Sequence, residues 1–210
     1  MILEIFSSGP FDTNTYIVGC SATKQAVIID VPFESARWLV SRVQKLSLVP
    51  THILLTHSHW DHIADVSELK NSLNLPVYVH EKDAANLIHL GADGLPIFME
   101  MKGVMPDGYL LEGAKISVGE HELIVLHTPG HTPGSVCFYG EKDKILFSGD
   151  TLFQGSMGRV DFPTSSPSDM WESLKKLSLL ASDTRVYPGH GDSTTIGAEK
   201  WMAHAEKKFG

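Results

Sequence analysis

Short apolar runs alternate with amphipathic stretches in the first half of the chain. The runs are rich in β-branched and large apolar residues and are bounded by turn residues, which is typical of strands; they span 2–6, 15–20, 25–30, 52–56 and 76–80. Apolar residues at helical spacing predict helices over 33–47, 63–73 and 81–90. This alternation predicts an α/β fold.

The second half begins with an irregular segment and then again shows strands followed by helices. Residues 91–113 contain Gly, Pro and Met without a clear period, which predicts a long surface connection. Strands follow at 115–119, 122–128, 135–140 and 144–149, then a helix at 167–181, a strand at 185–188 and a helix at 197–208. No stretch has the composition of an interdomain linker, so residues 1–210 are predicted to form one α/β domain.

The strand at 52–56 runs directly into a cluster of polar side chains. His57, His59, Asp61 and His62 lie within six positions, where the chain should turn from the strand toward a helix. Ligand sites of α/β proteins lie at such carboxyl ends of strands. One carboxylate could cap the helix, but three histidines are not needed for that purpose. We therefore expect these four residues to bind metal.

Three more strands end in a metal-capable residue beside glycine. His131 lies between two Pro-Gly turns, Asp150 follows Gly149, and His190 has a glycine on each side. Glycine allows the backbone to turn sharply without crowding an ion. Together with the first cluster, these residues supply five histidines and two carboxylates. Such a set suits two divalent ions, and zinc, iron and manganese all accept these ligands.

Four motifs resemble those of the metallo-β-lactamase superfamily, in its order and approximate spacing. They are T-H-S-H-W-D-H (56–62), T-P-G-H-T (128–132), S-G-D-T (148–151) and P-G-H-G (188–191). The resemblance implies an αββα sandwich, two β-sheets flanked by helices, with two metal ions, expected to be zinc, at one edge of the sheets. It also implies the ligands: His57, His59 and His131 for the first metal, Asp61, His62 and His190 for the second, and Asp150 as the bridge.

Within the superfamily, the chain is similar to short glyoxalase II-type hydrolases. The segment GSMGRVDFP (155–163) carries this resemblance, and related persulfide dioxygenases share its core. The resemblance implies hydrolysis of a small acyl thioester, such as S-lactoylglutathione, by a metal-bridging hydroxide that Asp61 orients. The alternatives are a mononuclear iron persulfide dioxygenase and, less favoured, an RNA-processing metallo-nuclease. Aspartate at position 150, where the classical β-lactamases of the superfamily carry cysteine, disfavours antibiotic hydrolysis.

Substrate contacts are less well defined than the metal ligands. Trp60 lines the substrate cleft or merely covers the sheet edge, and Arg159 contacts substrate or only ties a loop together through Asp161. The Met-rich segment 97–105 forms an apolar wall above the metals or packs as a surface loop. Long glyoxalase II enzymes hold glutathione with a C-terminal helical extension that this sequence lacks, so glutathione itself is expected to contribute little binding energy.

The composition limits which binding partners and which cellular compartment are expected. A formal net charge of −8 argues against nucleic acid and anionic membranes and leaves a small molecule as the expected partner. Two cysteines, Cys20 and Cys137, lie in separate apolar stretches, which predicts buried free thiols in a reducing compartment. We find no signal peptide or membrane span, so a cytoplasmic protein is expected. His127 either orients a metal ligand or packs, and packing is expected for the remaining histidines, at positions 52, 80, 89, 121 and 204.

Overall fold

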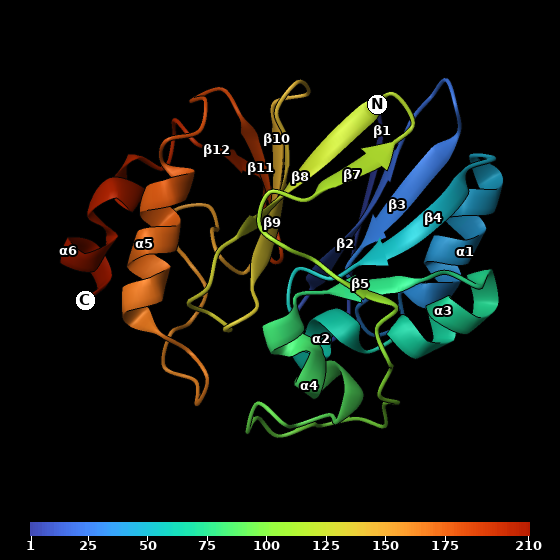
Figure 1. Ribbon diagram of the computed structural model, residues 1–210, viewed down its shortest axis with the longest axis horizontal. Helices are drawn as coiled ribbons and strands as arrows, with labels where there is room; N and C mark the ends of the chain where they lie inside the picture. Colours follow the sequence, from blue (N-terminus) through green and yellow to red (C-terminus); the bar gives the residue numbers. More distant parts are fainter.

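The computed structural model describes residues 1–210 as two six-stranded mixed sheets that pack face to face (Figure 1). The first sheet has the order β1 (Ile2–Ser8), β2 (Thr13–Gly19), β3 (Gln25–Ile29), β4 (Val49–Leu54), β5 (Val77–Val79) and β6 (Gly108–Tyr109). The second contains β7 (Lys115–Val118), β8 (His121–His127), β9 (Val136–Gly140), β10 (Ile145–Gly149), β11 (Arg185–Pro188) and β12 (Thr194–Thr195) in the reverse spatial order.

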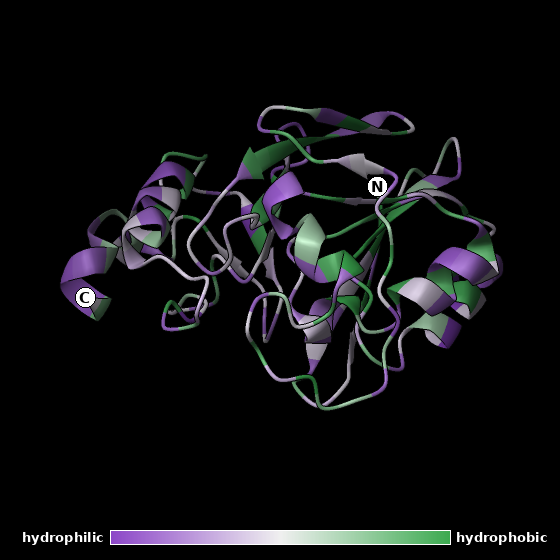
Figure 2. Cartoon of the chain, turned by 60° about the horizontal axis from the view of Figure 1, so that its bottom comes forward, coloured by the Kyte–Doolittle hydropathy of each residue, from purple (hydrophilic) through white to green (hydrophobic).

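Helices cover the outer face of each sheet (Figure 1). The first-sheet side carries α1 (Ala36–Lys45), α2 (Trp60–Ile63), α3 (Val66–Leu73) and α4 (Ala84–Ile88), the last after the 3₁₀ turn Glu81–Asp83. The second-sheet side carries α5 (Pro167–Leu177), the 3₁₀ turn Lys200–His204 and α6 (Ala205–Phe209). In Figure 2, mostly hydrophobic strands lie between these more polar helices. The predicted αββα sandwich is confirmed.

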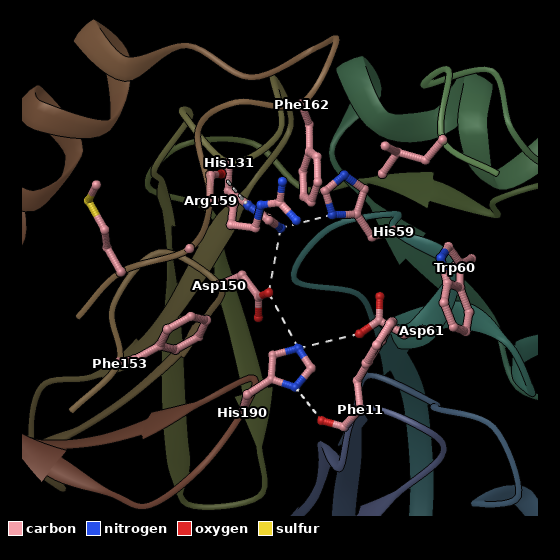
Figure 3. A pocket seen from close by; sticks show the side chains of 13 residues that line it. Phe11, His59, Trp60, Asp61, His131, Asp150, Phe153, Arg159, Phe162 and His190 are labelled. Atoms are coloured by element: carbon pink, nitrogen blue, oxygen red, sulfur yellow. Dashed lines mark hydrogen bonds and ion pairs between the residues drawn. The ribbon is translucent and has the colours of Figure 1, made fainter. Parts of the chain in front are cut away.

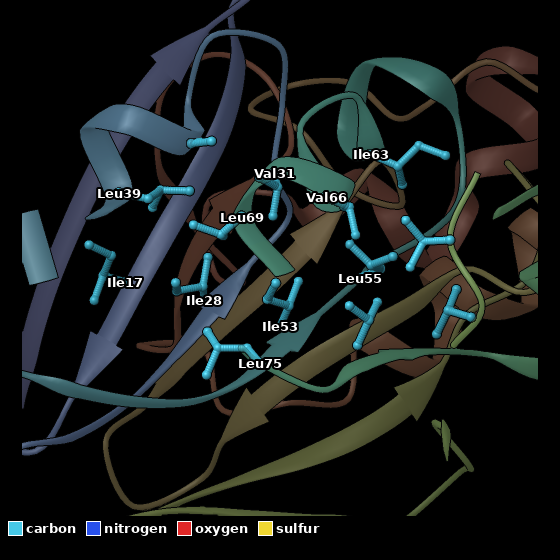
Figure 4. Close-up of a cluster of buried hydrophobic side chains, with 14 of the residues drawn as sticks. Ile17, Ile28, Val31, Leu39, Ile53, Leu55, Ile63, Val66, Leu69 and Leu75 are labelled. Carbon is cyan, nitrogen blue, oxygen red and sulfur yellow. The ribbon is translucent and has the colours of Figure 1, made fainter. Parts of the chain in front are cut away.

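Adjacent strand residues point to opposite layers, and both layers are apolar. In β3, Ile28 packs with Leu39 of α1 and Leu69 of α3, as Figure 4 shows, whereas Val27 packs between the two sheets. In β10, Phe147 joins the same intersheet core. Strands buried on both faces give continuous apolar runs rather than a polar–apolar alternation, as in the first-half sequence.

The predicted 63–73 helix is wrong at its start. The chain forms α2 and α3 as separate pieces, because backbone groups at the break bond to Val31 instead of continuing one helix. The Val31 amide donates to the His62 carbonyl at 2.8 Å, and the Asp65 amide donates to the Val31 carbonyl at 3.0 Å. This break lets α2 begin at Trp60 and carry two of the predicted ligands at the sheet edge.

Other differences are at element ends and in very short strands. Residues 33–35 precede α1, the 81–90 helix starts as a 3₁₀ turn and ends at Ile88, and only 205–209 of the last helix is α-helical. The 91–113 connection contains β6, and the unpredicted β12 has only two residues. Cys20 and Cys137 are buried and unpaired as expected. No helix combines the length and apolar character that a membrane crossing requires.

Candidate metal centre

The chain brings all seven predicted ligands together at one edge of the sandwich. The segment from His57 to His62 follows β4, His131 lies between β8 and β9, Asp150 follows β10, and His190 follows β11. Figure 3 shows several of these side chains converging from both sheets on one cavity.

Three histidines form the first group of ligand atoms, here called site 1. The ring nitrogens of His57, His59 and His131 that can bind metal lie within 4.8 Å of one another. His59 Nδ1 is 2.8 Å from His131 Nε2, and all three side chains are buried. This spacing suits three nitrogen ligands of one ion.

A second group, here called site 2, consists of Asp61, His62 and His190. His190 Nε2 is 3.3 Å from His62 Nε2 and 3.3 Å from Asp61 Oδ2. His62 is fully buried, whereas His190 lies at the cavity surface. The mixed nitrogen and oxygen donors suit zinc, iron or manganese.

Asp150 lies between the two groups and contacts both. Its Oδ2 is 3.5 Å from His131 Nε2 of site 1 and 3.4 Å from His190 Nε2 of site 2. Its Oδ1 is 3.3 Å from His62 Nε2. Asp61, the other carboxylate among the predicted ligands, does not contact both groups in this way.

The unsatisfied polar atoms of the cluster fit bound metal. His57 Nε2 and Asp150 Oδ1 are buried without a hydrogen-bond partner. Buried polar atoms in proteins normally have a partner, and a cation would satisfy these two. The residues therefore fit divalent metal ions, in agreement with the donor set expected from the sequence.

Electrostatics within the cluster also favour positive charge at its centre. Burial lowers the pKa of His57 well below its usual value, and the neighbouring His62 adds to the effect. Burial alone would raise the pKa of Asp150, but attraction to His62 and hydrogen bonding with His190 hold it well below its usual value. Burial opposes protonation of His190, yet its bonds with Asp150 and Asp61 raise its pKa to about 9. The carboxylates thus stay ionised and attract cations.

Residues outside the seven orient the ligand side chains, and the sequence reasoning missed them. Asp30 Oδ2 is 2.8 Å from His62 Nδ1, and it also accepts a hydrogen bond from the Thr56 hydroxyl at 2.7 Å. Thr13 donates to Asp61 Oδ2 at 2.9 Å. Such outer contacts fix the ligand orientation and the histidine tautomer. Asp30 also follows an apolar strand, and that signal could have identified it.

Backbone carbonyls hold two further ligands. His131 Nδ1 donates to the Arg159 carbonyl at 2.7 Å, and His190 Nδ1 donates to the Phe11 carbonyl at 3.0 Å. Both rings therefore turn Nε2 toward Asp150. Main-chain partners carry no residue signature, so no feature of the sequence could have revealed them.

Glycine is required where the chain passes closest to the ligands. A Cβ at Gly189 would lie 2.1 Å from Asp150 Oδ1 and 2.7 Å from His62 Cε1. A Cβ at Gly158 would lie 2.0 Å from the Asp150 carbonyl. The glycine beside His190 thus gives the ligands room, as the sequence predicted.

A cavity of about 420 Å³ opens above the ligands. Trp60 and Arg159 both line it, so each is placed to meet a substrate. Arg159 is also paired with Asp161, as the loop-tying interpretation expected, and a contact between this arginine and substrate stays a prediction. From the Met-rich segment, Phe98 packs against Trp60 with ring centroids 6.0 Å apart, but no residue of 97–105 lines the cavity itself.

The other histidines do not contact the predicted ligands. The His127 ring stacks on His80 with centroids 4.1 Å apart, and its Nε2 bonds to the Pro133 carbonyl, so it packs rather than orients a ligand. His52 contacts Tyr78, and His121 pairs with Asp143. His89 and His204 are exposed.

The sandwich and its ligand cluster define a metallo-hydrolase class of protein. The model of the Metallo-beta-lactamase superfamily matches residues 8–190, so the chain belongs to that superfamily. The hydroxyacylglutathione hydrolase GloC of Haemophilus influenzae is 35% identical over 95% of each chain.

Solved structures agree with this assignment. BLEG-1, described as a B3 metallo-beta-lactamase, is 35% identical and covers 100% of both chains with a TM-score of 0.87. TTHA1623 in a di-iron-bound form is 40% identical over 93% of this chain and 96% of its own, with a TM-score of 0.81. ETHE1 from Myxococcus xanthus is 31% identical over 95% of this chain and 82% of its own, with a TM-score of 0.79.

Proposed function

We propose that the protein hydrolyses small acyl thioesters of the S-lactoylglutathione type, with two divalent metal ions held by the seven ligands. The observation that carries this proposal is Asp150, whose carboxylate contacts both site 1 and site 2. The similarity to GloC supports the substrate class. We propose zinc as the metal, with iron or manganese as alternatives; the di-iron neighbour supports iron.

The metal ions and the residues around them would have different roles in the proposed reaction. Bound divalent ions would lower the pKa of a water molecule and polarise the substrate carbonyl. Asp61 lines the cavity next to His190, where its carboxylate can orient the attacking water by accepting a hydrogen bond. Thr13 holds that carboxylate in place through its own hydrogen bond.

The absence of a dedicated proton donor favours thioesters over amides. No lysine, tyrosine or cysteine lines the cavity, and the histidines and aspartates that line it are all among the seven proposed metal ligands. A thiolate leaves readily without protonation in the same step, whereas an amine leaving group requires a general acid. The formal net charge of −8 also supports a small molecule over nucleic acid as substrate.

The structural neighbour ETHE1 supports a second function, a persulfide dioxygenase, with equal weight. Such an enzyme would use iron and consume oxygen. Non-haem iron oxygenases hold iron with two histidines and one carboxylate, and the same cluster contains such groups, so geometry does not separate the two reactions. The two reactions differ in whether they depend on oxygen.

The deciding experiment compares substrates with and without oxygen. The metal-loaded protein should cleave S-lactoylglutathione at the same rate in both conditions and release one thiol per carboxylate. Turnover of glutathione persulfide that stops without oxygen, together with no thioester cleavage, would establish the dioxygenase instead. A β-lactam completes the panel because BLEG-1 is a neighbour, and we expect no turnover of it.

A further inference from the structure

The walls of the cavity differ in character from its floor. The floor consists of ligand side chains, whereas aromatic and other apolar groups form the walls: Phe11, Trp60, Leu95, Phe153, Met157 and Phe162. These residues come from the β1–β2 turn, from α2, and from the loops that follow α4 and β10. The part of a substrate that lies away from the reacting carbonyl would therefore meet an apolar surface.

An aromatic cluster extends this surface beyond the cavity mouth. Trp60 contacts Phe11, with ring centroids 5.3 Å apart, and Phe98, with centroids 6.0 Å apart. The two phenylalanines are 56% and 73% exposed, and together with Trp60 they form a contiguous apolar patch beside the cavity, a feature that often marks a binding site. Rings in this arrangement can pack against a flat apolar group.

Arg159 is the only cationic side chain of lysine or arginine in the wall, and its charge is already paired. Its Nε and Nη2 donate to Asp161 Oδ1 and Oδ2 at 2.8 and 2.7 Å. The guanidinium carbon also lies 4.4 Å from the centre of the Phe162 ring. This two-point pairing occupies one of the two edges through which a guanidinium can bind a carboxylate, and Asp161 balances its charge. The pair therefore gives this wall no net positive charge.

We propose that the site selects thioesters whose thiol half is uncharged and carries an apolar or aromatic group, and that Asp161 sets this selectivity by neutralising Arg159. Anionic thiols, including glutathione, should be the poorer thiol halves, because a carboxylate would lose water against an apolar wall without gaining a partner. This inference rests on the proposed thioester hydrolysis and specifies its substrate class.

The reaction requires only water as co-substrate. The water oxygen forms a bond to the acyl carbon, and the bond between that carbon and sulfur breaks. The sulfur leaves as a thiolate that takes up one of the two protons of the water, the other proton passes to solvent, and the acyl group leaves as a carboxylate. No electrons are transferred to or from another reactant, so the identity of the thiol half affects binding and leaving rather than the chemistry.

Two matched substrates test the selectivity. One is the lactoyl thioester of benzyl mercaptan, and the other is the same thioester with a carboxylate at the far end of the ring. We expect the neutral substrate to have a kcat/KM at least about tenfold higher, mainly through KM, because wall contacts bind substrate and transition state alike. In D161N the released Arg159 should shrink this ratio to about threefold or less, since a charged hydrogen bond then becomes available.

Two further variants serve as comparisons. Asp183 forms an exposed pair with Lys144 far from the cavity lining, so D183N removes the same charge and should leave the ratio unchanged. The double variant R159Q/D161N removes both charges of the pair and should retain the preference for the neutral substrate. A loss of activity on only the anionic substrate in this double variant would show that Arg159 binds anions directly and would overturn the proposal.

Binding measurements separate this proposal from the proposed reaction. Thioether analogues of the two substrates cannot be hydrolysed, so their affinities for the metal-loaded protein report on the walls alone. Tighter binding of the neutral thioether, reduced in D161N, supports the selectivity even if no thioester is cleaved. Equal binding of the two, or a preference for the anionic one in the unaltered protein, overturns it. Failure to cleave either thioester would instead refute the proposed function.

Discussion

One carboxylate oxygen of Asp150 contacts candidate ligands of both groups. Its Oδ2 lies within 3.5 Å of ring nitrogens from both site 1 and site 2, whereas among the seven ligands His190 contacts only those of site 2 and Asp150. If metal occupies both groups, loss of Asp150 removes an oxygen ligand from each ion, and loss of His190 removes a nitrogen ligand from one.

Replacing these two residues should therefore have different effects on metal content. We expect D150A to lose metal from both sites and to lower kcat/KM by about a hundredfold or more, since both catalytic ions are disturbed. H190A should keep site 1 filled and lose mainly the second metal. Elemental analysis of both purified variants measures this difference. If D150A keeps two bound metals and near-normal turnover, Asp150 is not the bridge.

At the scale of single residues, the sequence identified the functional side chains that lie in short local motifs. Each of the seven predicted ligands follows an apolar strand, and three of them adjoin glycine, so local chemistry was enough to identify them. Asp30 and Thr13 were missed because their role depends on sheet pairing, which brings β2 and β3 beside the ligand loop. The carbonyls of Phe11 and Arg159 could not be predicted from residue types at all.

The two loops that carry site 1 are joined through one buried carboxylate in the 3₁₀ turn before α4. Asp83 accepts hydrogen bonds from the Ser58 amide at 2.9 Å, from the Thr132 hydroxyl at 2.9 Å and from the Gly134 amide at 2.7 Å. Gly134 approaches so closely that a Cβ there would lie 2.4 Å from Asp83 Oδ1. This element therefore sets the spacing between the loop of His59 and the loop of His131.

Removing this carboxylate should loosen site 1 without touching a ligand. We expect D83A to weaken metal binding by roughly 10–100-fold, the usual effect of losing a group that orients ligands. Competition with a chelator measures this affinity. D107A is the control, because Asp107 also accepts a backbone hydrogen bond, from Val77, but is not among the groups near the ligands. Equal metal affinity in D83A and the unaltered protein would mean that the loops hold their spacing without Asp83.

Most elements could be predicted from the sequence because the burial of their side chains follows a simple pattern. Strands such as β9 and β10 are buried on both faces and give largely apolar runs. The break between α2 and α3 was not predictable, since it depends on hydrogen bonds to Val31 from a different part of the chain. The two-residue strands β6 and β12 have too few positions to produce a period.

At the scale of the whole molecule, the ligands come from both halves of the sandwich. His57, His59, Asp61 and His62 follow a strand of the first sheet, and His131, Asp150 and His190 follow strands of the second. Bound metal would therefore connect the two sheets at one edge. Because such ligand sets assemble only in the folded chain, metal binding should stabilise the native state as a whole.

Metal removal should consequently lower the melting temperature as well as abolish activity. At free metal about a hundredfold above Kd, binding to the native state alone contributes about 2.7 kcal/mol, and each kcal/mol shifts Tm by roughly 2–4 °C in a chain of this size. We expect chelation to lower Tm by roughly 5–10 °C and added zinc, iron or manganese to restore it. Calorimetry with and without chelator measures the shift, and D150A, which lacks the bridge, should show a smaller one. An unchanged Tm with full activity after complete chelation would exclude a metal centre at this edge of the sandwich.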